Sequence, residues 1–198
     1  MMAPSTGRPR SIEELLALLA RADGAVDSTS RNGDPIGVLA HSLQCGELLW
    51  RSHPNDDELI AAGLVHDLGH VVTPGRPSDH GRIGAELIRR LLGDGVAELV
   101  ALHIPAKRYL VATDGDSSTA TAYQDILSHD STVSLGAQGG PMDAAEVADF
   151  AFLPHAERAV ALRRADDRAK VSGLAVRPVE FWRPLLERVR SSSAGHRI

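Results

Sequence analysis

The hydrophobic positions of the chain recur mainly with the period of an α-helix. Ile36, Leu39, Ala40 and Leu43 follow the i, i+3, i+4, i+7 spacing of one helical face, and Ile83, Leu87, Ile88 and Leu91 mark another. No stretch alternates between apolar and polar residues over a convincing length, and no segment repeats. The pattern therefore predicts an all-α fold.

Short polar motifs give the expected ends of these helices. Ser11 with Glu14, Asn55 with Glu58 and Asp143 with Glu146 have the spacing of N-terminal capping boxes. Gly69 is expected to end the helix that follows Asn55, and further helices are expected over about 80–92, 120–128, 155–168 and 178–190. We expect irregular backbone over 71–79 and 131–141. The prediction is a single helical bundle over residues 11–190, with disordered ends at 1–10 and 191–198.

Composition limits the classes of protein that fit this pattern. Aromatic residues make up only 4% of the chain, so the core must be aliphatic, which favours packed helices. The net charge of −5 argues against a nucleic-acid partner, and no run approaches the roughly 18 apolar residues of a membrane span. A single cysteine, Cys45, and the lack of an apolar leader predict a cytoplasmic protein. Composition leaves a monomer and a homodimer equally open.

Six polar residues stand out, five of them on or beside the apolar helical faces, where a hydrophobic side chain is the ordinary choice, and one, His80, at the start of its helix after a loop. They are His41, His66, Asp67, His80, His103 and Asp166. Each alone could be a hydrogen-bonded core residue or a helix cap, but six such residues together indicate metal binding. Four imidazoles and two carboxylates fit two ions if Asp67 bridges them, and this ligand type is compatible with Fe, Mn or Zn. The second His-Asp pair, His129-Asp130, has no apolar face beside it.

Several segments around these residues resemble a known family. His41, then His66-Asp67, then Asp166 resembles the HD-domain superfamily, a helical metal-binding fold, and His80 with His103 resembles its dinuclear branch. Four longer segments narrow the resemblance to the di-iron oxygenases of the PhnZ/TmpB type, which cleave the carbon–phosphorus bond of 1-hydroxyphosphonates. These segments are HSLQCG (41–46), HDLGH (66–70), HIPAKRYL (103–110) and QGGPMD (138–143). The resemblance covers about residues 30–190.

The resemblance implies an enzyme with two Fe ions, as Fe(II)/Fe(III), and O2 as co-substrate. One iron would be held by His41, His66, Asp67 and Asp166, and the other by Asp67, His80 and His103. No catalytic residue beyond these ligands is implied. The substrate would be a small organophosphonate such as 2-amino- or 2-trimethylammonio-1-hydroxyethylphosphonate, and the products would be orthophosphate and a carboxylate.

A phosphonate substrate predicts cations and neutral donors near the metals. Lys107 follows His103 by one helical turn, and Arg163 precedes Asp166 by three residues, so both can point toward the site. His70, Ser131 and Ser134 would add further contacts. The family's enzymes that act on aminoethyl substrates are expected to have a Tyr and a Glu before the first ligand helix. Arg31 and Asp34 stand there in this chain, which leaves the substituent on C2 of the substrate open.

Two other functions fit part of the same pattern. An HD-type metal-dependent phosphohydrolase acting on a nucleotide or another phosphate monoester would use the same fold and four of the six ligands. His80, His103 and the Lys107 segment favour the oxygenase, because a mononuclear hydrolase needs no second site. A degenerate HD domain that only binds a phosphorylated ligand would be expected to have lost ligands, whereas all six are present.

Overall fold

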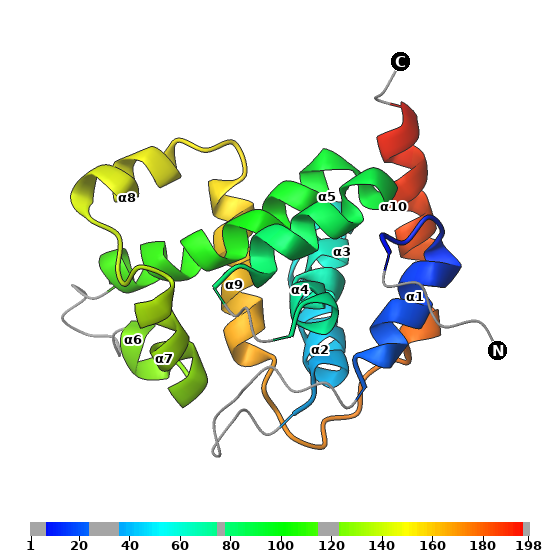
Figure 1. Cartoon of the computed structure of the whole chain (residues 1–198), viewed down its shortest axis with the longest axis horizontal. Helices are drawn as coiled ribbons and strands as arrows, with labels where there is room; N and C mark the ends of the chain where they lie inside the picture. Colours follow the sequence, from blue (N-terminus) through cyan, green and yellow to red (C-terminus); the bar gives the residue numbers. More distant parts are fainter. Residues whose placement is uncertain (1–6, 24–35, 75–77, 115–122, 196–198) are drawn as a thin grey trace.

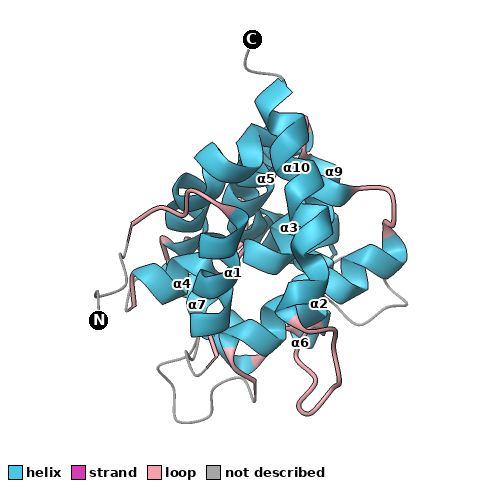
Figure 2. Ribbon diagram, turned by 90° about the vertical axis from the view of Figure 1, so that its right-hand side faces the viewer, coloured by secondary structure: helices cyan, strands magenta, loops and turns pink. Residues whose placement is uncertain are grey.

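The computed structural model describes residues 7–23, 36–74, 78–114 and 123–195, and within these ranges it contains helices and no strand (Figures 1 and 2). The all-α prediction is confirmed. In chain order the elements are α1 (Ile12–Arg21), α2 (Val38–Ser52), α3 (Asp57–Val65), α4 (Leu68–Val72), α5 (His80–Thr113), α6 (Tyr123–Ile126), α7 (His129–Ala137), α8 (Ala144–Ala151), α9 (Ala156–Arg168), the 3-10 helix η2 (Val179–Trp182) and α10 (Arg183–Gly195). No helix in the described part of the chain is long and apolar enough to cross a membrane.

Helix α3 is the centre of the bundle. Every residue from Leu59 to Val65 is buried, so this helix is apolar on all sides, as expected for a helix enclosed by others. It contacts α2, α5, α9 and α10, and Figure 1 shows α5 crossing this group. His66 and Asp67 come directly after α3, so the core itself places them at the middle of the protein.

Helix α5 is a long helix that bends at Gly93. This residue has a φ of +90°, which L side chains rarely adopt, and a Cβ there would lie 2.5 Å from Cβ of Ser193 on α10. The glycine therefore makes a kink within one helix rather than the end of the helix expected at about residue 92. The part of α5 after the kink carries His103 and Lys107 toward α7.

A second, smaller core joins the end of α5 to α6 and α7. It consists of Leu110, Val111, Tyr123, Leu127 and Leu135. The irregular backbone predicted from 131 to 141 is wrong for residues 131–137, which belong to α7. The Ser128 side chain caps this helix by accepting a hydrogen bond from the backbone N–H of Ser131, and Leu135 anchors it to the second core. Irregular backbone is confined to the segment around Gly139 and Gly140, which both have positive φ.

Other helix ends differ from the expected ones for identifiable reasons. Helix α3 is capped by Asp56 rather than Asn55, and the Asp56 carboxylate also pairs with Arg158 of α9 at 2.6 Å. Residues 71 and 72, expected in a loop, complete the short helix α4. Helix α10 continues to Gly195, past the expected end at 190, and Ser193 in this added part lies against Gly93 of α5.

Candidate metal centre

The backbone around His66 and Asp67 directs their side chains toward residues of α2, α5 and α9. Asp67 stands at the N-cap position of α4, yet its carboxylate makes no capping hydrogen bond and is left for the centre. Gly69 allows the start of α5 to approach, because a Cβ there would lie 2.0 Å from the carbonyl oxygen of His80. The sequence interpretation of Gly69 as a helix end is therefore wrong, and close backbone approach is what requires glycine.

Three of the candidate histidines are fixed by backbone carbonyls. Their Nδ1–H groups donate to carbonyl oxygens: His41 to Ala169 at 2.8 Å, His66 to Gly63 at 2.9 Å and His103 to Val100 at 2.6 Å. A carbonyl can only accept, so the hydrogen of the neutral ring is on Nδ1 and the Nε2 lone pair points into the centre. Metal-binding histidines are commonly oriented in this way.

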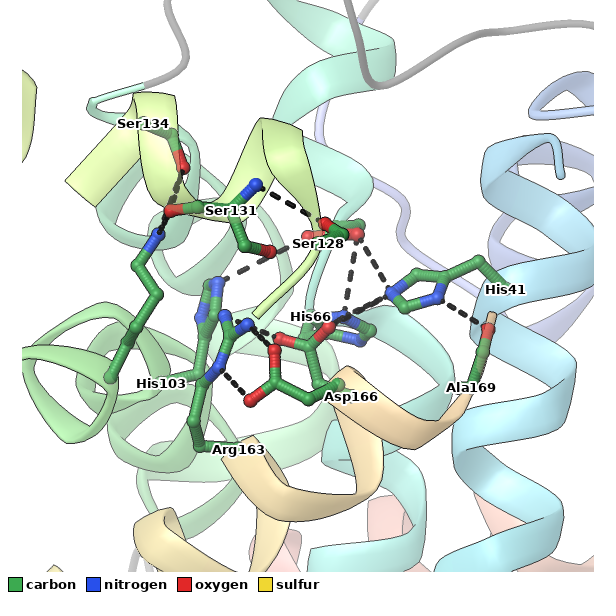
Figure 3. Close-up of polar contacts among 12 residues, drawn as sticks. His41, His66, His103, Ser128, Ser131, Ser134, Arg163, Asp166 and Ala169 are labelled. Carbon is green, nitrogen blue, oxygen red and sulfur yellow. Dashed lines mark hydrogen bonds and ion pairs between the residues drawn. The ribbon is translucent and has the colours of Figure 1, made fainter. Parts of the chain in front are cut away.

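The first group of converging atoms comes from α2, the end of α3, and α9 (Figure 3). Nε2 of His41 lies 3.2 Å from Nε2 of His66 and 3.1 Å from Oδ1 of Asp166. The Asp67 Oδ2 atom lies 3.3 Å from each of these two Nε2 atoms. All four side chains are buried. Two imidazoles and two carboxylates therefore surround one point.

The second group lies on the other side of Asp67. Its Oδ1 atom is 3.4 Å from Nε2 of His80 and 4.0 Å from Nε2 of His103, while those two nitrogens are 2.9 Å apart. The two oxygens of one carboxylate therefore face two different sets of imidazoles, which is the arrangement of a bridging ligand. The His70 ring stacks on that of His80 with ring centroids 3.9 Å apart, and one of its nitrogens lies within 4.8 Å of ligand atoms of Asp67 and His80.

The chemistry of these donors fits metal cations. In His41 and His66 the Nε2 lone pairs face each other at 3.2 Å, a contact that is repulsive unless a positive charge lies between them. Burial disfavours a charged ring, but Asp166 and Asp67 outweigh it and raise the pKa of His41 to about 9. The pKa of Asp67 is held well below its usual range because His66 and His41 outweigh the effect of burial. The arrangement therefore favours a positive charge between these donors, such as a bound metal cation would supply.

Arg163 lies beside Asp166, where its guanidinium is paired with two carboxylates. Its guanidinium pairs with Oδ2 of Asp166 at 2.8 Å, and with Asp167, whose carboxylate also accepts a hydrogen bond from Tyr123. Asp166 therefore presents one oxygen to the imidazoles and has the other held by Arg163. Asp167 and Tyr123 were not singled out from the sequence, because an Asp next to a ligand and a lone Tyr give no pattern.

Lys107 is buried at 2% exposure and reaches α7. Its ammonium donates to Oγ of Ser134 at 2.8 Å and to the carbonyl oxygen of Ser131 at 3.3 Å. Burial, and next the charge of Arg163, lower the pKa of Lys107 to about 7. The structure thus brings together three residues predicted to bind substrate.

Lys170 and Ser128 belong to the same region and were missed. The Lys170 ammonium donates to Oγ of Ser128 at 3.0 Å and to Oγ of Ser131 at 3.1 Å. Lys170 lies just past the end of α9, where sequence periodicity gives no signal. Arg108 is largely buried and holds the segment after α7 by donating to the Gly140 carbonyl at 2.8 Å and pairing with Glu146.

The remaining predicted or excluded residues can be placed briefly. Arg31 and Asp34 lie outside the described residues. His129, which has no apolar face beside it in the sequence, is exposed, and so is His53. His155 pairs with Glu98 at 3.2 Å, away from the centre.

Comparison with known proteins identifies relatives of this chain. The family model described as HD domain matches residues 35–132. The chain is 36% identical over 163 residues to a hydroxymethylphosphonate dioxygenase of Gimesia maris, and the match covers 78% of both proteins. It is 30% identical over 171 residues to the 1-hydroxy-2-(trimethylamino)ethyl phosphonate dioxygenase (glycine-betaine-forming) of Leisingera caerulea, covering 82% of this chain and 84% of the relative.

Proposed function

Because the chain belongs to the family of HD-domain phosphonate dioxygenases, we propose that it uses O2 to cleave the carbon–phosphorus bond of a 1-hydroxyphosphonate. The balanced reaction converts R–CH(OH)–PO3²⁻ and O2 into R–COOH and HPO4²⁻. The C–P bond and the C1–H bond break, C1 is oxidised to the carboxyl level, and both atoms of O2 enter the products. Three observations support this proposal: the names of the two relatives, the match to the HD-domain model, and the arrangement of the centre.

The observation that carries the proposal is the two-sided carboxylate of Asp67. We assign one iron to His41, His66, Asp67 and Asp166, and a second iron to Asp67, His80 and His103. As an Fe(II)/Fe(III) pair, the ions would supply the activation of O2. The protein's own part is to hold six donors in fixed positions in a buried space: carbonyl groups orient three imidazoles and Arg163 orients Asp166.

We assign the phosphonate group to the space between the centre and the first turns of α7. Lys107, Ser131 and Ser134 present an ammonium and hydroxyl groups there, and His70 lies on the side of His80. A phosphonate dianion favours the charged form of Lys107, so its binding is expected to draw a proton onto this amine. Arg163 acts mainly through Asp166, because its guanidinium is already paired with two carboxylates.

Orthophosphate release from iron-reconstituted protein tests the proposed reaction. The panel should contain hydroxymethylphosphonate and the 2-amino- and 2-trimethylammonio-1-hydroxyethylphosphonates, each with and without O2. We expect phosphate to appear only with O2, and label from ¹⁸O2 in both the phosphate and the carboxylate. Phosphate released from a nucleotide monophosphate without O2 consumption would instead establish an HD-type phosphohydrolase. A matched methylphosphonate control, which lacks the hydroxyl group, should release none.

A further inference from the structure

Gln44 is the residue of the 41–46 segment for which the proposed reaction has no obvious use. It lies on α2, three residues after His41, and only 2% of its surface is exposed. A buried amide is costly unless both its donor and its acceptor are satisfied. Its partners therefore indicate why the position holds an amide.

Both ends of the Gln44 amide bind the backbone of Val171. Its Nε2–H donates to the Val171 carbonyl oxygen at 2.8 Å, and its Oε1 accepts from the Val171 N–H at 3.1 Å. Val171 follows the last residue of α9 by three positions, and its side chain is 50% exposed. Ala169 is fully buried in the core, but packing does little to hold Val171 itself, and the two hydrogen bonds to Gln44 fix this residue against α2.

The two residues before Val171 connect this clamp to the centre. The Ala169 carbonyl accepts the hydrogen bond that orients His41, at 2.8 Å, and Lys170 reaches the hydroxyl groups of Ser128 and Ser131. Three consecutive residues thus have three different partners: Ala169 contacts the candidate ligand His41, Lys170 contacts the first turn of α7, and Val171 contacts Gln44. A shift of this segment would move the first two contacts together.

Lysine usage in this chain adds a second, independent observation. The whole sequence contains two lysines, Lys107 and Lys170, against nineteen arginines. Both ammonium groups donate to the serines at the start of α7, Lys107 to Ser134 and Lys170 to Ser128 and Ser131. Lysine differs from arginine in presenting a compact point charge, which suits two cations that share one small anion.

We propose that Gln44 is a positioning residue that, through the backbone of Val171, sets the orientation of His41 and places Lys170 as a second cation of the phosphonate subsite. The identity of the anion rests on the proposed function. The positioning role rests on the contacts of residues 169–171. An amide is required because a carboxylate can accept from the Val171 N–H but cannot donate to its carbonyl oxygen.

Four variants separate the parts of this proposal. Gln44→Met removes both hydrogen bonds at similar volume, Gln44→Glu keeps the acceptor alone, and Lys170→Met removes only the cation. Leu48→Met, on the same helix and half-buried, is the control. Three properties are measured without O2: Fe(II) affinity by chelator competition, affinity of iron-loaded protein for methylphosphonate by calorimetry, and hydrogen exchange at the Val171 amide.

Gln44→Met is expected to lose protection of the Val171 amide and to weaken both affinities about tenfold, the order expected for one to two neutral hydrogen bonds. For Gln44→Glu, the protection of the Val171 amide and both affinities should lie between those of Gln44→Met and of the wild type. Lys170→Met should weaken methylphosphonate binding about tenfold and leave iron binding unchanged, and Leu48→Met should change neither. A folded Gln44→Met with wild-type affinities, or Lys170→Met with unchanged methylphosphonate binding, would overturn the proposal.

If Gln44→Met does not fold, Gln44→Glu decides by the same criteria, and wild-type values for both affinities would refute the positioning role. None of the three properties depends on turnover. If the variants showed the expected pattern but the protein released no phosphate from any 1-hydroxyphosphonate, the role of Gln44 would be supported and the proposed reaction would be refuted. The two failures are therefore distinguishable.

Discussion

Replacing Lys107 by Met is expected to make the metal-free protein more stable at neutral pH while impairing phosphonate binding. The amine is 2% exposed, and burial together with Arg163 lowers its pKa from 10.5 to about 7, against the opposing effect of Asp166 and Asp167. A cation held in such a place for function costs folding free energy. Removing it should recover that cost, because the methylene stem packs equally well in methionine.

The size of the effect follows from linkage between protonation and folding. The unfolded chain keeps the Lys107 proton up to about pH 10.5, whereas the folded protein releases it near pH 7. Between these values the unfolded state binds more protons, so the wild-type free energy of unfolding rises with pH. At pH 6 the buried cation lowers the wild-type free energy of unfolding by its full penalty, roughly 5 kcal/mol. The substitution recovers this penalty but also removes the hydrogen bond to Ser134, which offsets about 1 kcal/mol of the gain in stability. The net stabilisation of Lys107→Met should therefore be about 3–4 kcal/mol near pH 6 and should shrink toward pH 10.

Urea unfolding of both proteins from pH 6 to pH 10 measures this difference directly. The two lysines also allow an independent check, because ¹³C,¹⁵N-lysine labelling gives two side-chain signals, which Lys170→Arg assigns. The Lys107 signal should titrate near pH 7 in the free protein and at higher pH with methylphosphonate bound. A Lys107→Met protein less stable than wild type at pH 6, or a stability gap that does not depend on pH, would refute the reasoning.

Three further substitutions test the surroundings of the centre. Arg163→Met should lower the free energy of unfolding by about 3–5 kcal/mol, because it leaves the Asp166 carboxylate buried without its cation, whereas the exposed Arg164→Met should cost less than about 1 kcal/mol. An equal effect of the two in urea unfolding would contradict the role given to Arg163. Gly69→Ala should displace the start of α5 and reduce bound iron, measured by metal analysis, while Gly136→Ala, with no atom within 4 Å of the new Cβ, should keep full iron content. Arg108→Met should speed proteolysis between residues 137 and 143, and an unchanged cleavage rate would show that its bonds to Gly140 and Glu146 do not hold this segment.

Local patterns in the sequence were enough to predict the helical fold and the six residues that the structure brings together at the centre. Helical periodicity reports which face of a helix is buried, so a histidine on such a face, as at His103, is conspicuous. The start of α5 at His80 and the capping box of Asp143 with Glu146 are present as predicted. The roles of these residues as iron ligands remain a proposal.

The contacts between distant segments could not be predicted in this way. Gln44 meets Val171 across 127 positions, and Lys170 meets Ser128 across 42, and neither pair leaves a periodic signal. Arg163 was correctly expected near the site, but its partner Asp167 makes it a support for Asp166 rather than a free cation. Residues 131–137 were misread because small polar residues suggest a loop, whereas the Ser128 cap and the burial of Leu135 stabilise a helix.

The number of irons bound per chain tests the central claim most directly. Anaerobic Fe(II) titration, followed by metal analysis after desalting, should give two irons per wild-type chain, one per chain for His103→Ala, and a loss at both sites for Asp67→Ala. O2-dependent phosphate release should require the second iron. A wild-type protein that binds one iron and is fully active, or an Asp67→Ala protein that retains two, would contradict a centre built on one shared carboxylate.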